Sequence, residues 1–272
     1  MFFVLASSAW AGGGGLGFTG EIWSGRKSEL THRFDYQSKS FPDRHREVRA
    51  RFTRTDGALE LEETLIYEAN GKLRSYDFDQ PVLKIFSKVT FSQEAIDFEQ
   101  KKWGDTKKIT KERPQGPVLV IDEVPPFVRD HWESFSETAP KETRLPFTYV
   151  VADRMDMFAF TLRRAEKQTS PTRVTIVMQA ESPIIRMFVA PAELDFEKYG
   201  EHRLLESRGP LPVRSKVDGQ WLPLVGRLVL KRDPIQKPIQ SSDPWATTKK
   251  TSIIEKPKKK ITLPEASSNS KR

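Results

Sequence analysis

Three Asx-Gly dipeptides, flanked by residues that alternate between apolar and polar, constrain the fold of this chain most. Asp56-Gly57, Asn70-Gly71 and Asp218-Gly219 are sequences that two-residue type I′ β-hairpins prefer, because both central residues of that turn have positive φ. Apolar and polar residues alternate on both sides of the first two dipeptides. This pattern predicts an antiparallel meander over residues 47–80 with one buried and one solvent-facing surface.

The first two turns also fix which residues lie opposite one another. Phe52 faces Leu61 across the first hairpin, and Leu65 faces Tyr76 across the second; a slip of one residue would exchange the two faces of a strand. The apolar face then consists of Val48, Ala50, Phe52, Leu59, Leu61, Leu65, Tyr67, Tyr76 and Phe78, with Glu63 as an exception. The polar face consists of Arg49, Arg51, Glu60, Glu62, Thr64, Ser75 and Asp77, whose Arg and Glu residues are expected to form ordinary cross-strand pairs.

The rest of the body contains further strand patterns and one helix pattern. The helix lies near residues 126–137, where Phe127, Val128, Trp132 and Phe135 share one face. Strands are expected at 17–24, 28–37, 82–91, 95–100, 118–122, 145–151, 157–164, 172–179, 184–189, 193–198, 202–208, 211–217 and 220–231. The sequence therefore predicts a mainly β domain over 17–232 with one short amphipathic helix. Whether it forms one sheet or two subdomains that meet near residues 111–117 is left open.

The N-terminal residues have the character of an export signal. Phe2 to Ala6 form a short apolar run, and Ala9-Trp10-Ala11 fits the small-x-small pattern that signal peptidase cleaves. No Lys or Arg precedes the run, so the charged part of the signal is expected upstream of Met1. The prediction is a signal peptide remnant at 1–11, a flexible start at 12–16 and a periplasmic or secreted location in a bacterium. The alternative is a buried first strand followed by a linker.

Positive charge is concentrated at the C-terminal end of the sequence. The formal net charge is +8, and residues 233–272 carry nine basic and four acidic side chains. This Pro-, Lys- and Ser-rich segment has no apolar periodicity, which predicts a disordered basic tail. A tail of this kind is either simply solvated or an electrostatic tether to anionic lipid headgroups or acidic envelope polymers, through Lys256, Lys258, Lys259 and Lys260. Nucleic acid is not an expected partner, because the folded body is nearly balanced in charge.

No motif in the sequence nominates catalytic, metal-binding or cofactor-binding residues. The chain has no Cys, and its four His lack the spacing of a metal site. Walker, Rossmann, EF-hand and G-x-S-x-G patterns are absent. Paired acids such as Asp122-Glu123 lie at expected strand ends or turns. We therefore expect a protein without enzymatic activity or cofactor.

The second half of the chain resembles a family of uncharacterised secreted bacterial β-proteins. The likeness covers about residues 18–231 and is carried by "PPFVRDHWESF", by Ser182-Pro183-Ile184-Ile185-Arg186, by Pro191, Leu194 and Phe196, and by Arg203-Leu204-Leu205 before Gly209. The resemblance implies export to the periplasm and a curved antiparallel sheet wrapped about a helix. Such a half-open, barrel-like sheet is similar to those of periplasmic lipoprotein and lipid carriers. It implies no catalytic residues.

The aromatic helix and the apolar face of the meander are the candidate ligand-binding residues. Either they fill the core, or the helix covers an apolar cavity that a curled sheet leaves open. The cavity would be lined by Phe127, Trp132 and Phe135 of the helix and by Phe52, Tyr76 and Phe78 of the sheet. The leading hypothesis is a non-enzymatic periplasmic protein that binds an apolar or amphipathic molecule in a curved sheet, for instance in envelope maintenance. The alternatives are an envelope scaffold with a filled core and an envelope enzyme without a recognisable motif.

Overall fold

The computed structural model describes residues 16–25, 28–167, 170–217 and 219–231. The predicted signal peptide remnant, most of the flexible start and the basic tail lie outside these residues, as do the four lysines of the proposed tether.

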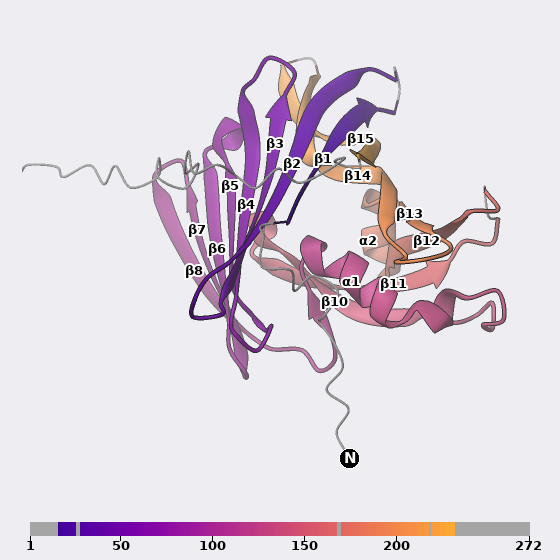
Figure 1. Cartoon of the computed structure of the whole chain (residues 1–272). Helices are drawn as coiled ribbons and strands as arrows, with labels where there is room; N and C mark the ends of the chain where they lie inside the picture. Colours follow the sequence, from indigo (N-terminus) through magenta and orange to yellow (C-terminus); the bar gives the residue numbers. More distant parts are fainter. Residues whose placement is uncertain (1–15, 26–27, 168–169, 218, 232–272) are drawn as a thin grey trace, which may run out of the picture. The chain divides into compact units, whose positions relative to one another are not determined.

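The described residues fold as a mainly β domain built on one open, curved sheet of fifteen strands (Figure 1). The spatial order is β8-β7-β6-β5-β4-β3-β2-β1-β15-β14-β13-β12-β11-β10-β9, and neighbours are antiparallel except β9 and β10. The two halves belong to one sheet because β1 pairs with β15, whereas residues 113–117 connect the two edge strands β8 and β9. The N-terminal strands are β1 (Leu16–Ser24), β2 (Leu30–Ser40), β3 (Arg46–Arg54), β4 (Leu59–Tyr67), β5 (Leu73–Gln80), β6 (Ile85–Phe91), β7 (Ala95–Lys102) and β8 (Asp105–Glu112). The C-terminal strands are β9 (Val118–Leu119), β10 (Leu145–Val151), β11 (Asp156–Arg164), β12 (Arg173–Ala180), β13 (Ala192–Glu197), β14 (Leu204–Val217) and β15 (Gln220–Lys231).

The helical segments are short. The predicted aromatic helix is confirmed as α1 (Val124–Asp130), which has proline in its first turn and is followed by the 3₁₀ helix η4 (Trp132–Phe135). The other 3₁₀ helices are η2 (Pro81–Leu83), η3 (Ile121–Glu123) and η5 (Ala152–Arg154).

Four of the predicted strands need correction. The strand expected at 184–189 is wrong, because these residues form the helix α2 (Pro183–Phe188). The strand expected at 118–122 ends after two residues and continues as η3, and the two strands expected at 202–208 and 211–217 are the single strand β14. β8 was not predicted, because its lysine-rich sequence lacks an apolar alternation. β8 is an edge strand, and its lysine side chains disfavour pairing of its free edge with strands of other molecules.

The predicted register of the meander is confirmed, but the predicted turn type is wrong. Phe52 pairs with Leu61 and Leu65 with Tyr76, as the alternation requires. In each turn, however, the glycine is the residue with positive φ, so neither turn is type I′. Both hairpins instead have three-residue loops, and a β-bulge in the strand after each loop restores the register.

The first bulge moves Glu60 to the face opposite the predicted one. Glu60 was expected on the polar face, but it is fully buried, because the register shift between Phe52 and Thr53 leaves it without a partner in β3. Its carboxylate accepts hydrogen bonds from the backbone N–H of Arg214 and from the ring of His32. On the polar face, the expected cross-strand pair forms between Arg51 Nε and Glu62 Oε2 at 2.6 Å.

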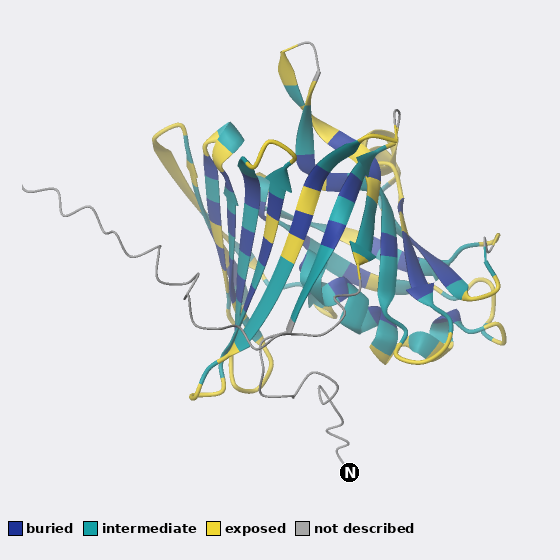
Figure 2. Ribbon diagram, turned by 45° about the horizontal axis from the view of Figure 1, so that its top comes forward, coloured by how far each residue is buried: buried dark blue, intermediate teal, exposed yellow. Residues whose placement is uncertain are grey.

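Two hydrophobic cores fill the inner side of the sheet. Buried and less buried positions alternate along the strands in Figure 2, so each strand has one buried face. The first core covers one face of β1–β7, continues onto β14 and β15, and includes buried residues of the chain around η3 and η5, namely Val120, Val150, Ala152 and Met155. The second core lies between α1 and the strands β10–β13. The inner surface of the described sheet is therefore largely covered by the protein itself.

The seam between β1 and β15 joins the two halves of the sheet and depends on Gly226. A Cβ atom at this position would lie 2.3 Å from the carbonyl oxygen of Trp23 in β1. We expect Gly226→Ala to lower the free energy of unfolding by about 1–3 kcal/mol, the usual cost of overpacking, because the strands must move apart. Urea unfolding followed by tryptophan fluorescence measures this loss.

Gly17→Ala in β1 is the matched control for the seam. The added Cβ would be 3.3 Å from its nearest neighbour, the carbonyl oxygen of Tyr36, so the loss should be smaller. Equal unfolding curves for Gly226→Ala and the unaltered protein would mean that β1 and β15 are not packed this closely.

Candidate functional site

The six aromatic residues predicted to bind a ligand are divided between the two cores. Phe52, Tyr76 and Phe78 are buried in the first core, on the inner face of the meander. Phe135 is fully buried in the second core, and Phe127 and Trp132 are partly buried against it. The structure thus brings together the members of each group of three but not the two groups in a single pocket.

Contacts with protein side chains occupy the aromatic face of α1 and η4. The Trp132 ring stacks on His202 with ring centroids 3.8 Å apart and meets Phe196 edge-on at 6.2 Å. Phe127 packs near Phe147, with centroids 6.2 Å apart. These contacts explain why the helix pattern is amphipathic without invoking a ligand.

A carboxyl group lies within the first core. Glu63, the exception on the apolar face of the meander, is buried and accepts a hydrogen bond from the Tyr76 hydroxyl. Burial raises the pKa of Glu63 to about 7, an effect that the Tyr76 hydrogen bond partly opposes and that the nearby Asp122 and Asp153 reinforce. Burial thus moves the protonation change of this carboxyl group from acidic pH toward neutral pH.

A second polar group links η3 to the inner face of the sheet. The Tyr67 hydroxyl donates to Asp122 at 3.1 Å, and the Arg46 guanidinium lies over the Tyr67 ring at 4.1 Å. Burial raises the pKa of Asp122, and burial likewise raises the pKa of Glu123 to about 7. Asp122 is bonded to tyrosine and Glu123 to the backbone N–H of Val120, so both carboxyls connect structural elements.

The third buried polar group is the pair of His32 and Glu60. His32 Nε2 lies 2.8 Å from Glu60 Oε2, and its Nδ1 lies 3.0 Å from the Thr31 hydroxyl. Alternation in the sequence does not reveal this pair, because the partners belong to different hairpins and the bulge at Glu60 leaves no periodic signal. No group of three potential metal ligands occurs among the residues that the structure describes.

The most exposed apolar surface lies on α2. Ile184, Met187 and Phe188 share one face of this helix and are 70%, 79% and 80% exposed. The helix begins at Pro183, and the side chain of Ser182 caps it by accepting a hydrogen bond from the backbone N–H of Ile185. Ile185 points the other way and packs against the second core. The sequence signal for this feature was the Ser-Pro start followed by an i, i+3, i+4 apolar spacing.

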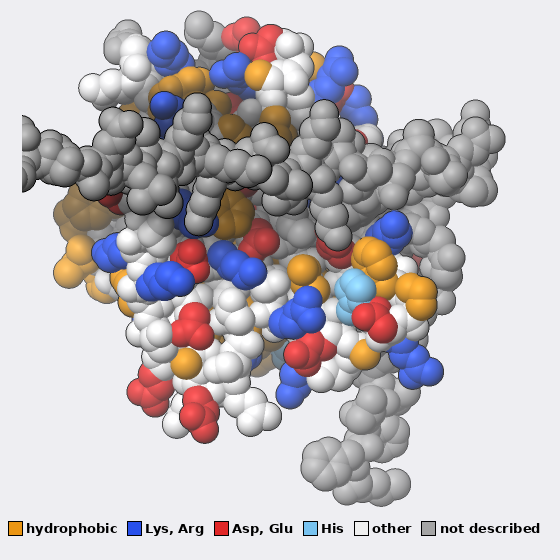
Figure 3. Space-filling model, turned by 90° about the vertical axis from the view of Figure 1, so that its left-hand side faces the viewer, with side chains coloured by type: hydrophobic (Ala, Val, Ile, Leu, Met, Phe, Trp, Pro, Cys, Tyr) orange, Lys and Arg blue, Asp and Glu red, His pale blue; other side chains and the backbone are white. Residues whose placement is uncertain are grey.

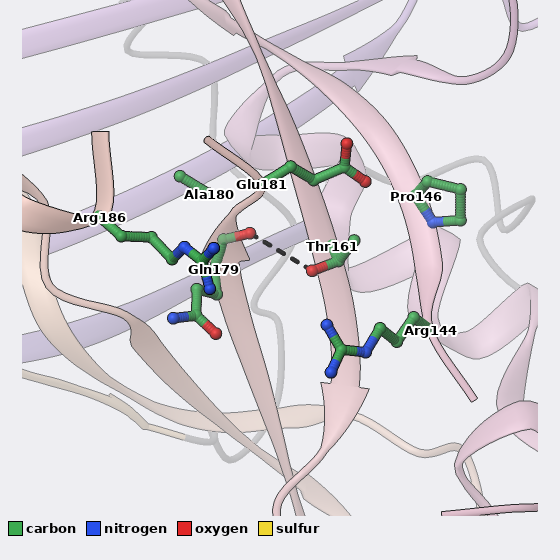
Figure 4. A pocket seen from close by; sticks show the side chains of 7 residues that line it. All are labelled: Arg144, Pro146, Thr161, Gln179, Ala180, Glu181 and Arg186. Atoms are coloured by element: carbon green, nitrogen blue, oxygen red, sulfur yellow. Dashed lines mark hydrogen bonds between the residues drawn. The ribbon is translucent and has the colours of Figure 1, made fainter. Parts of the chain in front are cut away.

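A pocket of about 320 Å³ adjoins α2 on the outer side of the sheet (Figure 4). Its charged side chains are Arg144, Glu181 and Arg186, none of which was predicted as a site residue. A second pocket, of about 410 Å³, lies near the ends of β5 to β8 around Trp103. None of the six predicted aromatic residues lines either pocket. The lining of the first pocket is Arg144, Pro146, Thr161, Gln179, Ala180, Glu181 and Arg186.

Basic and acidic side chains are interspersed on the face of the molecule that Figure 3 shows. Lys108 Nζ and Glu99 Oε2 form one ion pair of the protein surface, 3.0 Å apart. Within the described ranges, no helix has the length and apolar character needed to span a bilayer.

The fold defines a mainly β protein built on one open, curved antiparallel sheet. No family model matches the sequence, and no curated protein matches it. Among solved structures, the chain is similar to a β-barrel-like protein of the domain of unknown function DUF1849 from Brucella abortus: the match covers 80% of this chain and 97% of that one, with a TM-score of 0.46 and 13% identity. A porin-like protein from Bacteroides uniformis matches over 80% of this chain and 96% of its own, with a TM-score of 0.21 and 10% identity.

Proposed function

We propose that this chain is an exported, non-catalytic protein of the periplasm that binds a phospholipid surface through the exposed apolar face of α2. The observation that carries the proposal is the exposure of Ile184, Met187 and Phe188 on one side of a helix whose other side is anchored in the core. Large contiguous apolar patches are rare on the surfaces of monomeric soluble proteins and often mark sites of interaction with proteins or membranes.

The physical gain comes from moving these side chains out of water. Full burial of an Ile, Met or Phe side chain is worth about 1.5–3 kcal/mol. Three such side chains on one helix face are enough for weak, reversible binding to the boundary between headgroups and acyl chains, where short amphipathic helices lie. Arg186 adds a positive charge to the same helix.

This proposal places the lipid contact outside the sheet, unlike the hypothesis of a ligand held within it. The six aromatic residues expected to line an inner cavity pack against protein in two separate cores. The alternative hypothesis of an envelope scaffold with a filled core agrees better with these two cores. In such a protein, α2 would be the surface that binds the membrane.

Export and the basic tail belong to the same proposal. The apolar run at 2–6 with the small-x-small pattern at 9–11 supports passage through the inner membrane. The lysines Lys256, Lys258, Lys259 and Lys260 are proposed as a second, electrostatic contact with anionic headgroups, each worth about 1 kcal/mol near such a surface.

Vesicle flotation tests the proposal directly. The mature chain should float with vesicles of phosphatidylethanolamine and phosphatidylglycerol. The double variant Ile184→Ser/Phe188→Ser should bind at least tenfold more weakly, because about 1.4 kcal/mol of lost apolar transfer corresponds to each factor of ten. Circular dichroism should be unchanged, since both side chains are exposed.

Tyr199→Ser provides the matched control. Tyr199 is an exposed aromatic residue in the turn between β13 and β14, away from α2 in the chain, and its loss should leave flotation unchanged. If the unaltered protein does not float, or if the α2 double variant floats equally well, α2 is not a lipid-binding surface.

A further inference from the structure

The pocket beside α2 is built from the outer face of three strands and the helix itself. Pro146 of β10 pairs with Thr161 of β11, and Thr161 pairs with Gln179 of β12, so these residues form a continuous floor. Arg144 precedes β10 at one side, and Arg186 comes from α2 at the other. The pocket therefore lies beside α2, on the side of the helix that carries Arg186.

The charges in the pocket are separated. In the view of Figure 4, the guanidinium groups of Arg144 and Arg186 point toward each other across the floor, whereas the carboxylate of Glu181 lies on the other side of Thr161. Both arginines and Glu181 are exposed, and among the described residues no ion pair or hydrogen bond engages their side chains. Two positively charged hydrogen-bond donors and one negatively charged hydrogen-bond acceptor are thus available to a ligand.

We propose that this pocket binds the headgroup of a phospholipid that carries both a phosphate and a primary ammonium group. Arg144 and Arg186 would hold the phosphate, since guanidinium groups form strong charge-assisted hydrogen bonds with phosphate oxygens. Glu181 accepts hydrogen bonds from the ammonium group. The inference rests on the proposed docking of α2, because the helix would bring the headgroups of the same bilayer to the pocket.

The carboxylate of Glu181 determines which class of phospholipid headgroup the pocket prefers. A phosphate alone satisfies the arginines but leaves Glu181 close to a like charge. A trimethylammonium headgroup has the right charges, but it has no N–H to donate to Glu181. A primary ammonium next to the phosphate satisfies all three side chains, so phosphatidylethanolamine is preferred over phosphatidylcholine.

Neutral vesicles isolate this preference from the basic tail. Phosphatidylcholine vesicles and mixed phosphatidylcholine–phosphatidylethanolamine vesicles carry the same net charge, so the tail lysines experience the same surface in both. We expect the full mature chain to bind the mixed vesicles more tightly. Glu181→Ala, which removes the acceptor, should abolish the difference, and Arg144→Gln/Arg186→Gln should weaken binding about tenfold or more, the equivalent of one to two charge-assisted hydrogen bonds.

Arg33→Gln is the control for loss of an exposed arginine, because Arg33 lies on β2 rather than in the pocket, and it should bind as the unaltered chain does. A soluble probe, glycerophosphoethanolamine, tests the pocket without a bilayer. It should shift the NMR signals of Thr161 and Gln179, and glycerophosphocholine should shift them less.

The outcomes separate the two proposals. If α2 variants abolish vesicle binding but the two kinds of vesicle bind equally and neither probe shifts Thr161, the headgroup inference is overturned while α2 docking stands. If glycerophosphoethanolamine binds but no vesicle does, the docking of α2 fails and the pocket is a site for a soluble phosphoamine. If neither binds, both proposals fall.

Discussion

Phe135→Ala is expected to lower the free energy of unfolding by about 3–5 kcal/mol, the cost of removing a fully buried phenylalanine. Phe135 belongs to η4 and is completely enclosed by the second core, between α1 and the strands β10–β13. Its removal leaves a cavity that the short helix cannot fill. Urea unfolding at a fixed pH, followed by tryptophan fluorescence, gives the change in midpoint and slope.

Phe188→Ala is the matched control, because the same side chain is removed from a position that is 80% exposed. Its free energy of unfolding should stay within about 0.5 kcal/mol of the unaltered protein, as for most surface substitutions. A small effect of Phe135→Ala would show that α1 and η4 are only loosely attached, which is what a lid over a ligand cavity requires. The pair of variants therefore separates a structural helix from a movable one.

The meander shows how far alternation alone predicts a fold. The alternation in residues 47–80 predicts the strands, their register and their buried face. One face of each strand must be buried, and a slip of one residue would bury the charged side chains of the other face. Alternation did not reveal the bulges that follow the two loops. Glu60 was therefore assigned to the polar face, although it lies buried against His32 and Arg214.

α2 shows where a short apolar run misleads. The sequence from Pro183 to Val189 is rich in residues that favour strands, and a run of this length does not distinguish a strand from a helix. The Ser182 cap and the proline at the helix start decide for the helix. A strand at 184–189 would place these apolar residues in the sheet, whereas the helix leaves three of them exposed.

The pocket beside α2 was beyond prediction for a different reason. Arg144 and Arg186 are far apart in the sequence. They line the same pocket only because β10, β11 and β12 are neighbours in the sheet. Neither arginine belongs to a motif, and the chain contains many others. Long-range pairing of this kind follows from topology, which local patterns do not specify.

Glu63→Gln is expected to remove a large part of the pH dependence of stability. Burial raises the pKa of Glu63 from 4.5 to about 7. Between these two pH values the folded chain keeps a proton that the unfolded chain releases, so stability is fully present below about pH 4.5 and falls as the pH rises toward 7. The loss amounts to about 3 kcal/mol at pH 8, at about 1.4 kcal/mol per pKa unit.

Urea unfolding at a series of pH values from about 5 to 8 measures this effect. The unaltered protein should lose stability as the pH rises, and Glu63→Gln should lose about 2.5 kcal/mol less over this range, because its side chain carries no charge at any of these values. Some slope remains in the variant, since burial also raises the pKa of Glu123 to about 7. Glu94→Gln, an exposed residue in the turn between β6 and β7, should retain the slope of the unaltered protein. Parallel curves for Glu63→Gln and the unaltered chain would mean that Glu63 reaches solvent, and hence that the first core is open beside Tyr76.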